Sequence, residues 1–138
     1  MGCDIHAVVA VRRERGWDPV MTFVEGRDYA LFRAMAGVRY PEEVMPVTEP
    51  RGWPDGFAPR NMTDLSPSVW VSGDTWLGDH SYSWLNADEF AEAIKRAEEC
   101  TAGAYGGKRS SEYYGALAFM REMEKHHSEV ALVFGFDN

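Results

Sequence analysis

Segments with the alternation and apolar content of β-strands stand at both ends of this chain of 138 residues, and they limit the folds that it can adopt. Residues 4–12 alternate between two faces, and residues 130–136 form the last apolar segment. A polar turn after the first segment leads into residues 17–24, which are predicted to be the second strand of a hairpin. Because Pro19 cannot donate a hydrogen bond to a ladder, we expect this second strand at an edge of the sheet.

Helix signals lie between the two strand-like ends. Asp28 and Gly37 bracket a short helix over residues 28–36 as its cap and its stop, and Asn86 with Glu89 has the spacing of a capping box. That capping box predicts a helix over residues 86–100, and a third helix is predicted over residues 111–126. The predicted buried stripes are Leu31, Phe32 and Met35 on the first helix, Phe90, Ile94 and Ala97 on the second, and Tyr113, Leu117 and Met120 on the third.

The central part of the chain, residues 39–84, has the pattern of a loop, with residues 69–71 as a short further strand. No linker or repeat divides the sequence, so we expect a single domain over residues 1–138. The predicted fold class is α+β. A small antiparallel sheet has its first and last strands adjacent, with about three helices on one face and the long central segment over the other.

Charge and cysteine content exclude several classes of protein. With 22 acidic and 14 basic residues the net charge is −8, which disfavours a nucleic-acid polymer as partner because such binders need a basic face. Cys3 and Cys100 are too few for a disulfide framework. No segment has the length of a membrane span or the pattern of a secretory signal. These features predict a cytoplasmic protein with no membrane partner.

Polar side chains gather at one end of the predicted sheet. Asp4 and His6 share one face of the first strand, and antiparallel pairing brings Asp137 from the end of the last strand beside them. The rest of this face carries small side chains such as Ala131 and Gly135, which leave room for a ligand. We therefore expect a functional site at this end of the sheet.

A second polar group in the central segment supplies further candidates. Arg51 stands in a stiff loop suited to holding a carboxylate or a phosphate. The set Asp4, His6, His80 and Asp137 can hold a divalent metal ion, or Asp4, His6 and His80 can act as catalytic acids and bases. The ligand-binding residues are predicted to be Glu49, Arg51, Trp53, Asp55, Ser81, Ser83 and Trp84.

Structural roles are an alternative for the same residues. An Asp or His at a strand end is often solvated, and Arg51 can tie its loop to a surface acid. Trp53 and Trp84 can pack in the core or in a lid rather than stack on a ligand. Two other motifs are set aside. The glycine-rich segment 103–108 lacks the spacing of a phosphate loop, and strand alternation points Cys3 away from His6.

Several motifs resemble those of an uncharacterised family of small bacteriophage and prophage proteins, which begin with nearly the sequence Met-Gly-Cys-Asp-Ile-His of residues 1–6. In the central motif, Asp79 directly precedes His80, and Tyr82 stands where relatives have a second histidine, which weakens a metal site that needs three imidazoles. The resemblance implies a phage or prophage origin, a bacterial host cell and a shared site, and it supplies no reaction. The other matching motifs are residues 27–32, 36–39, 49–52, 54–55, 79–81, 83–85, 133–134 and 136–138.

These observations predict a phage-type accessory protein that binds a small phosphorylated or nucleotide-like ligand and can hydrolyse it as a phosphoesterase-like enzyme. Non-catalytic sequestration of a host immune signal nucleotide needs the same residues, so the sequence does not choose between the two. A third hypothesis is an inhibitor whose acidic surface binds a host protein. The sequence leaves open whether the chain forms a homo-oligomer.

Overall fold

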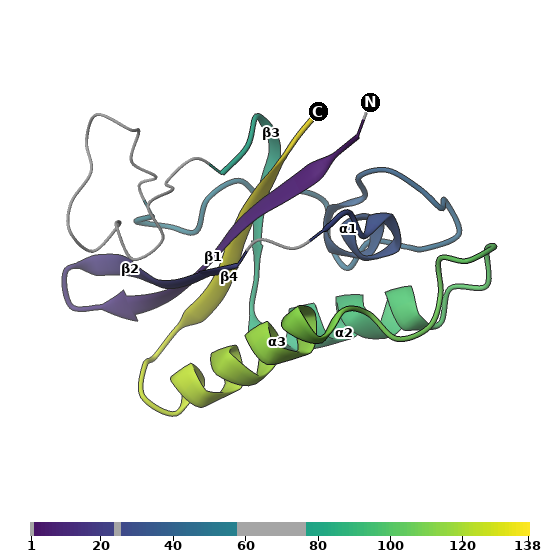
Figure 1. Cartoon of the computed structure of the whole chain (residues 1–138). Helices are drawn as coiled ribbons and strands as arrows, with labels where there is room; N and C mark the ends of the chain where they lie inside the picture. Colours follow the sequence, from purple (N-terminus) through teal and green to yellow (C-terminus); the bar gives the residue numbers. More distant parts are fainter. Residues whose placement is uncertain (1, 24–25, 58–76) are drawn as a thin grey trace.

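The chain folds as an α+β protein, as predicted (Figure 1). The computed structural model describes residues 2–23, 26–57 and 77–138, and within them the chain forms one four-stranded antiparallel sheet and three helices. The strand order is β2-β1-β4-β3, so the first and last strands are adjacent. The elements are β1 (Asp4–Arg13), β2 (Gly16–Phe23), α1 (Tyr29–Ala36), β3 (His80–Leu85), α2 (Ala87–Glu98), α3 (Ser111–Glu124) and β4 (Val130–Asp137).

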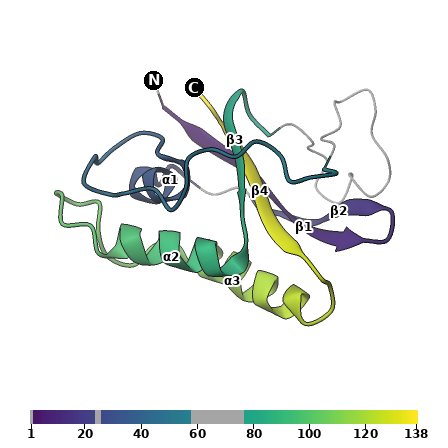
Figure 2. The ribbon, with the colours of Figure 1, turned by 180° about the vertical axis from the view of Figure 1, so that it is seen from behind.

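The register between β1 and β4 places the polar ends of the two strands together. Asp4 lies opposite Asp137, and His6 lies opposite Gly135. The pairing is antiparallel, so the chain termini emerge at the same end of the sheet (Figures 1 and 2). At the other side of β1, the strand β2 is at the edge of the sheet, as Pro19 requires. The alternation of the two terminal segments therefore predicted the central pairing of the sheet.

The predicted capping residues set both ends of α1 and the start of α2. The side chain of Asp28 accepts a hydrogen bond from the backbone N–H of Leu31 at 3.1 Å, and Gly37 ends α1 in the left-handed conformation. Asn86 and Glu89 form a complete capping box at the start of α2, with both hydrogen bonds at 2.9 Å. None of the helices in the described part of the chain combines the length and apolar character that crossing a bilayer requires.

One face of the sheet packs against all three helices and forms the main hydrophobic core. The large apolar side chains of β4, including Phe134 and Phe136, lie on this face and are fully buried. Phe32 of α1 meets Phe136 edge to face, with ring centroids 5.2 Å apart. This layer holds the strands rigidly, and it fixes the positions of the polar groups at their ends.

The opposite face carries smaller side chains and is covered by loops instead of helices. Val8, Ala10, Ala131 and Val133 form its buried centre with Leu77, and four partly buried aromatic residues pack on it, namely Trp17, Trp53, Phe57 and Trp84. A Cβ atom on Gly135 would lie 2.0 Å from the backbone oxygen of Leu77 and 2.7 Å from the ring of Tyr82. The space expected to admit a ligand over Gly135 is therefore filled by the chain itself.

The prediction that residues 39–84 are loop-like, apart from residues 69–71, is wrong at β3, which is a strand. Its sequence, His-Ser-Tyr-Ser-Trp-Leu, is short, and its buried position 83 is a serine, so it lacks the apolar inward-facing residues by which a strand is recognised. Pairing with β4 defines it, with His80 opposite Phe136 and Leu85 opposite Leu132. The register shifts between His80 and Ser83, where Ser81 has a positive φ of 57°. The short strand predicted at residues 69–71 lies outside the described residues.

Candidate functional site

The central feature of the polar end of the sheet is a hydrogen-bonded pair formed by His6 and Asp137. The Nε2 atom of His6 lies 2.5 Å from Oδ2 of Asp137, and the two side chains are 19% and 23% exposed. The register of β1 and β4 produces this contact, because it places Asp137 next to the strand position of His6 on the same face. The predicted approach of these two residues is confirmed.

Asp4 belongs to the same end of the sheet but has a different partner. Nε of Arg27 donates to Oδ1 of Asp4 at 2.9 Å, and Nη2 of Arg27 lies 3.4 Å from Oδ2. This hydrogen bond holds the pKa of Asp4 below its usual value. Both side chains are about half exposed, so an ion pair of this kind contributes little to stability. Its consequence is local, since it places a guanidinium group beside the His6–Asp137 pair.

His80 lies at the same end of the sheet, in contact with the last residue of the chain. Its Nε2 atom is 2.5 Å from Oδ1 of Asn138, and its Nδ1 atom is 2.9 Å from the hydroxyl of Ser81. The imidazole also stacks on Phe136, with ring centroids 6.2 Å apart. Because Phe136 points to the helix-covered face, His80 and His6 lie on opposite faces of the sheet. The two histidines are therefore close to one strand end without sharing one face.

Three buried or partly buried residues lie next to this polar end, namely Cys3, Tyr29 and Arg39. The backbone N–H of Cys3 donates to the hydroxyl of Tyr29 at 3.2 Å, and the guanidinium of Arg39 lies 5.2 Å from the centroid of the Tyr29 ring. Burial raises the pKa of the Cys3 thiol, and the hydrogen bond from Arg39 offsets only part of this effect. A buried thiol with a raised pKa is a poor nucleophile, so Cys3 is not a candidate catalytic residue.

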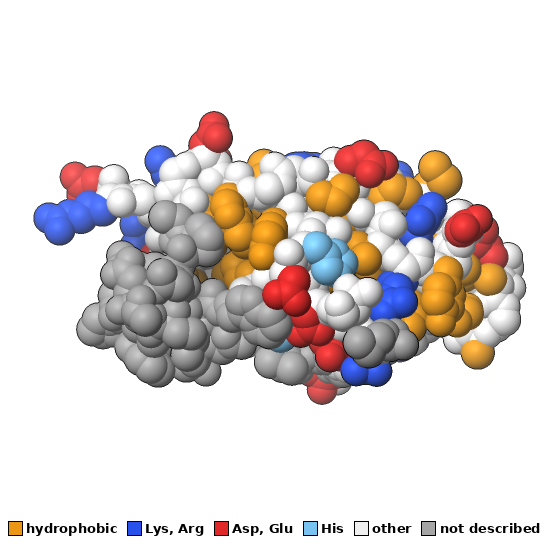
Figure 3. Space-filling model, turned by 90° about the horizontal axis from the view of Figure 1, so that it is seen from above, with side chains coloured by type: hydrophobic (Ala, Val, Ile, Leu, Met, Phe, Trp, Pro, Cys, Tyr) orange, Lys and Arg blue, Asp and Glu red, His pale blue; other side chains and the backbone are white. Residues whose placement is uncertain are grey.

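Arg27, Arg39 and Asn138 were not singled out from the sequence as site residues. Their partners lie far along the chain, so spacing alone gives no sign of them. The available signal was the resemblance to phage proteins, because its motifs at residues 27–32, 36–39 and 136–138 include all three. The end of the sheet seen from above shows a histidine beside acidic and basic side chains (Figure 3).

Arg51 is tied to the first turn of α2 instead of pointing to the His6–Asp137 pair. Nη1 of Arg51 donates to Oε1 of Glu89 at 3.2 Å, and Nη2 donates to Oε2. The guanidinium also lies 4.4 Å from the centroid of the Trp84 ring. Burial raises the pKa of Glu89, but hydrogen bonds from Arg51 and Asn86 outweigh it and hold the pKa below its usual value. Arg51 thus joins its loop to a helix, and its binding of a ligand anion stays a prediction.

The loop that carries Arg51 runs along the outer edge of β3. The backbone N–H of Gly52 donates to the carbonyl of Tyr82 at 2.8 Å, and that of Arg51 donates to the hydroxyl of Ser83 at 3.0 Å. Ser83 is fully buried, so its hydroxyl serves this contact. Trp53 follows on the same loop and packs against Tyr82, with ring centroids 4.5 Å apart. These contacts cover the edge of the sheet, which would otherwise expose unpaired backbone groups.

The remaining predicted ligand-binding residues are spread along the molecule. Asp55 lies at the other end of β1 from His6, where its carbonyl accepts hydrogen bonds from Arg12 at 3.0 Å and Trp17 at 2.8 Å. Glu49 is exposed on the loop before Arg51. The structure therefore brings together Asp4, His6 and Asp137 on one face of the sheet, with His80 and Ser81 at the same strand end on the other face. It places Glu49, Arg51, Trp53, Asp55, Ser83 and Trp84 elsewhere.

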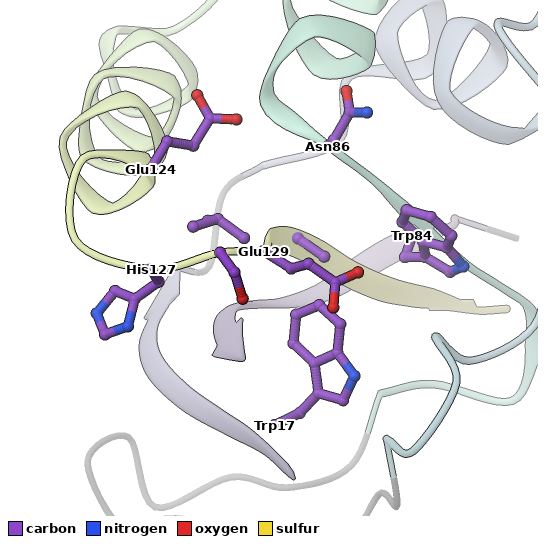
Figure 4. Close-up of a pocket in the computed structure, with 9 residues that line it drawn as sticks. Trp17, Trp84, Asn86, Glu124, His127 and Glu129 are labelled. Atoms are coloured by element: carbon purple, nitrogen blue, oxygen red, sulfur yellow. The ribbon is translucent and has the colours of Figure 1, made fainter. Parts of the chain in front are cut away.

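A cavity lies at the end of β4 opposite to Asp137 and its partner His6 (Figure 4). Its volume is about 420 Å³, and Trp17 and Trp84 are its aromatic walls. Asp137 is seven positions after Val130 along β4, which at roughly 3.3 Å per residue is about 23 Å. The other lining residues are Asn86, Glu124, His127, Ser128, Glu129, Val130 and Ala131. The two regions are separate sites.

Each of the four predicted metal ligands bonds to another side chain, and two of them bond to each other. Asp4 pairs with Arg27, His6 with Asp137, and His80 with Ser81 and Asn138. Among the described residues, no group of three or more His, Cys, Asp or Glu side chains is arranged to hold a metal ion. These side chains as placed do not fit a metal, and the divalent ion stays a prediction.

Comparisons of the chain with protein-family models, with curated proteins and with solved structures gave no match. The fold and the site geometry are therefore the basis for a functional proposal. The resemblance to phage proteins also stays a prediction.

Proposed function

We propose that this protein binds a small phosphorylated or nucleotide-like ligand at the polar end of the sheet and hydrolyses it with His6 as general acid and base. The observation that carries the proposal is the hydrogen bond of 2.5 Å between His6 and Asp137. A carboxylate bonded to one ring nitrogen orients an imidazole and stabilises its protonated form, which is the arrangement that acid–base catalysis uses. Both side chains remain partly exposed, so a ligand can reach them.

The reaction would proceed by proton transfer through His6. The imidazole accepts a proton from an attacking water molecule, whose oxygen forms a bond to phosphorus. The bond from phosphorus to the leaving oxygen breaks, and that oxygen takes the proton from His6. Asp137 stabilises the imidazolium between these two transfers. No other reactant is required.

Arg27 supports a ligand that carries negative charge. Its side chain is 53% exposed and its guanidinium lies at the edge of the site on Asp4, so a phosphate group can share its hydrogen-bond donors. The Arg27 contact also offsets the charge of the Asp4 carboxylate, which would otherwise repel an anion. The resemblance to phage proteins favours a host metabolite or signalling nucleotide of the bacterial cytoplasm.

Native mass spectrometry of the chain purified without chelator tests whether such a ligand is bound. We expect a mass excess over the denatured protein that corresponds to a phosphorylated compound. The His6→Gln variant should lose this excess, and His126→Gln should keep it, because His126 is exposed just after α3 and pairs with Glu122. A metal ion bound to Asp4, His6, His80 and Asp137 would appear in the same spectra as a much smaller mass excess.

Turnover of the released compound, followed by phosphorus NMR, tests the acid–base role. We expect His6→Gln to lower the rate by roughly 10² to 10⁴ with circular dichroism unchanged. Binding of the compound with no turnover in the wild type would leave sequestration as the function. An unaltered rate in His6→Gln would contradict the catalytic proposal. A purified chain that carries no ligand and captures a stoichiometric host protein would contradict it in favour of an inhibitor.

A further inference from the structure

The cavity between the start of β4 and the β1–β2 hairpin has features of a binding site that the proposed function does not use. Its volume of about 420 Å³ falls within the range of roughly 300 to 1,000 Å³ that is common for small-molecule sites. Two elements far apart in the sequence supply its tryptophans, Trp17 from β2 and Trp84 from β3. The segment before β4 supplies polar groups from His127, Ser128 and Glu129.

Both tryptophans already act as surfaces for cations within this chain. The guanidinium carbon of Arg12 lies 5.7 Å from the centroid of the Trp17 ring, and that of Arg51 lies 4.4 Å from the Trp84 ring. Both indoles line the cavity, and neither arginine does. The negative potential of an aromatic face favours a cation there as well.

Carboxylates add negative charge to the cavity. Glu129 is exposed, and no cation among the described residues pairs with its carboxylate, which Figure 4 shows directed toward the indole rings. Glu124 also lines the cavity, and its Oε1 atom lies 3.6 Å from Nη1 of Arg121. Among the described residues that line the cavity there is no lysine or arginine, which suits it to positive charge. The net charge of −8 acts in the same direction over a longer range.

We propose that this cavity binds an organic cation, with the two indoles against its apolar surface and Glu129 against its charge. The chemistry that fits is a quaternary or alkylated ammonium group or a guanidinium group, because each combines positive charge with a weakly hydrated surface. A small free metabolite and a modified lysine or arginine side chain of a partner protein both offer this group. The cavity is the size of one such head group with part of its chain.

Choline and its uncharged carbon analogue 3,3-dimethylbutan-1-ol are the first probes, because they match in shape and differ in charge. We expect choline to shift the indole N–H signals of Trp17 and Trp84 in NMR spectra of the full chain, and the neutral analogue to leave them unchanged. Equal binding of both compounds, or no shift with either choline or a peptide carrying trimethyl-lysine, would overturn the proposal.

Two glutamate variants separate a cavity effect from a general charge effect. Glu129→Gln should weaken choline binding by roughly fivefold to tenfold, and Glu122→Gln should not, because Glu122 is exposed on α3 and pairs with Lys125 and His126. Equal weakening by both would overturn the proposal. Tighter binding of the trimethyl-lysine peptide would identify a partner protein as the source of the cation, and tighter binding of choline a free metabolite. His6→Gln should leave all these affinities unchanged, which separates this test from that of the proposed hydrolase.

Discussion

The two faces of the sheet differ in what covers them and in what they can do. The helix-covered face buries the large side chains of β4 completely against α1, α2 and α3. The loop-covered face has small buried side chains at its centre and partly buried tryptophans around them. His6 and Asp137 stand at one end of the loop-covered face, and the cavity stands at the other. Both candidate sites are therefore on the face with fewer large buried residues.

In this chain the main hydrophobic core and the candidate sites therefore lie on opposite faces of the sheet. Helices on one face bury enough apolar surface to hold the strands, so the other face can keep polar and half-exposed groups at its ends. The loops on that face still pack tightly where Tyr82 and Leu77 meet Gly135. The free energy of unfolding should therefore respond differently to substitutions on the two faces.

The largest effect is expected on the helix-covered face. Phe134→Ala should lower the free energy of unfolding by about 3 to 5 kcal/mol, because it removes a fully buried ring from the main core. Its neighbour Val133 points to the other face, and Val133→Ala should cost only about 2 kcal/mol because fewer buried carbons are lost. Urea denaturation of both variants measures the difference. Equal losses would mean that the loop-covered face contributes as much to stability.

An intermediate effect is expected where the loop crosses β4. Gly135→Ala should lower the free energy of unfolding by about 1 to 3 kcal/mol, because its Cβ would meet the Leu77 oxygen and the Tyr82 ring. Gly115→Ala is the matched control, since a Cβ there meets nothing within 4 Å and α3 gains helix propensity of up to about 1 kcal/mol. Thermal denaturation of the two variants should shift in opposite directions. A stable Gly135→Ala protein would show that the loop can move away from β4.

The smallest effect is expected at the contact between Arg51 and Glu89. Glu89→Gln keeps a residue that can complete the capping box and removes the charge, so we expect a loss of about 1 kcal/mol at neutral pH. The folded-state pKa of Glu89 is lowered from 4.5, so its contribution is present above that pH. It is lost as the pH falls below 4.5 and through the lowered value.

Urea titrations of the wild type and Glu89→Gln from pH 7 to pH 3 measure this dependence. The difference between the two proteins should shrink as the solution becomes more acidic. The Arg51→Gln variant and the double variant complete a mutant cycle that isolates the pairwise energy. A difference that is constant with pH would assign the loss to altered helix capping instead of charge.

Much of the fold could be predicted because its signals are local. Alternation in the first and last segments placed the strands β1 and β4, and it also placed Asp4, His6 and Asp137 at one strand end. Asp28, Gly37 and the pair Asn86 and Glu89 determined the helix boundaries through backbone groups within a few residues. Each of these signals depends on residues that are neighbours in the sequence or on a period of two.

The side-chain partners in the candidate site could not be predicted in the same way. Asp4 has Arg27 as its partner, Arg51 has Glu89, and His80 has Asn138, over separations of 23, 38 and 58 residues. Loop paths decide the first two contacts, and the pairing of β3 with β4 decides the third; no local period encodes either. The strand β3 was missed for the same reason, since only its pairing with β4 distinguishes it from a polar loop.

The sequence alone thus determined an α+β fold in which the first and last strands pair. It also placed His6 beside Asp4 and Asp137 at the end of that pair of strands, because backbone geometry repeats every two residues along a strand. Only the tertiary structure decided that His80 lies on the other face from His6, that Arg51 binds a helix, and that Trp17 and Trp84 enclose a cavity. These arrangements result from many weak contacts between segments far apart in the chain. The segments meet, and the contact energies add up, only in the folded state.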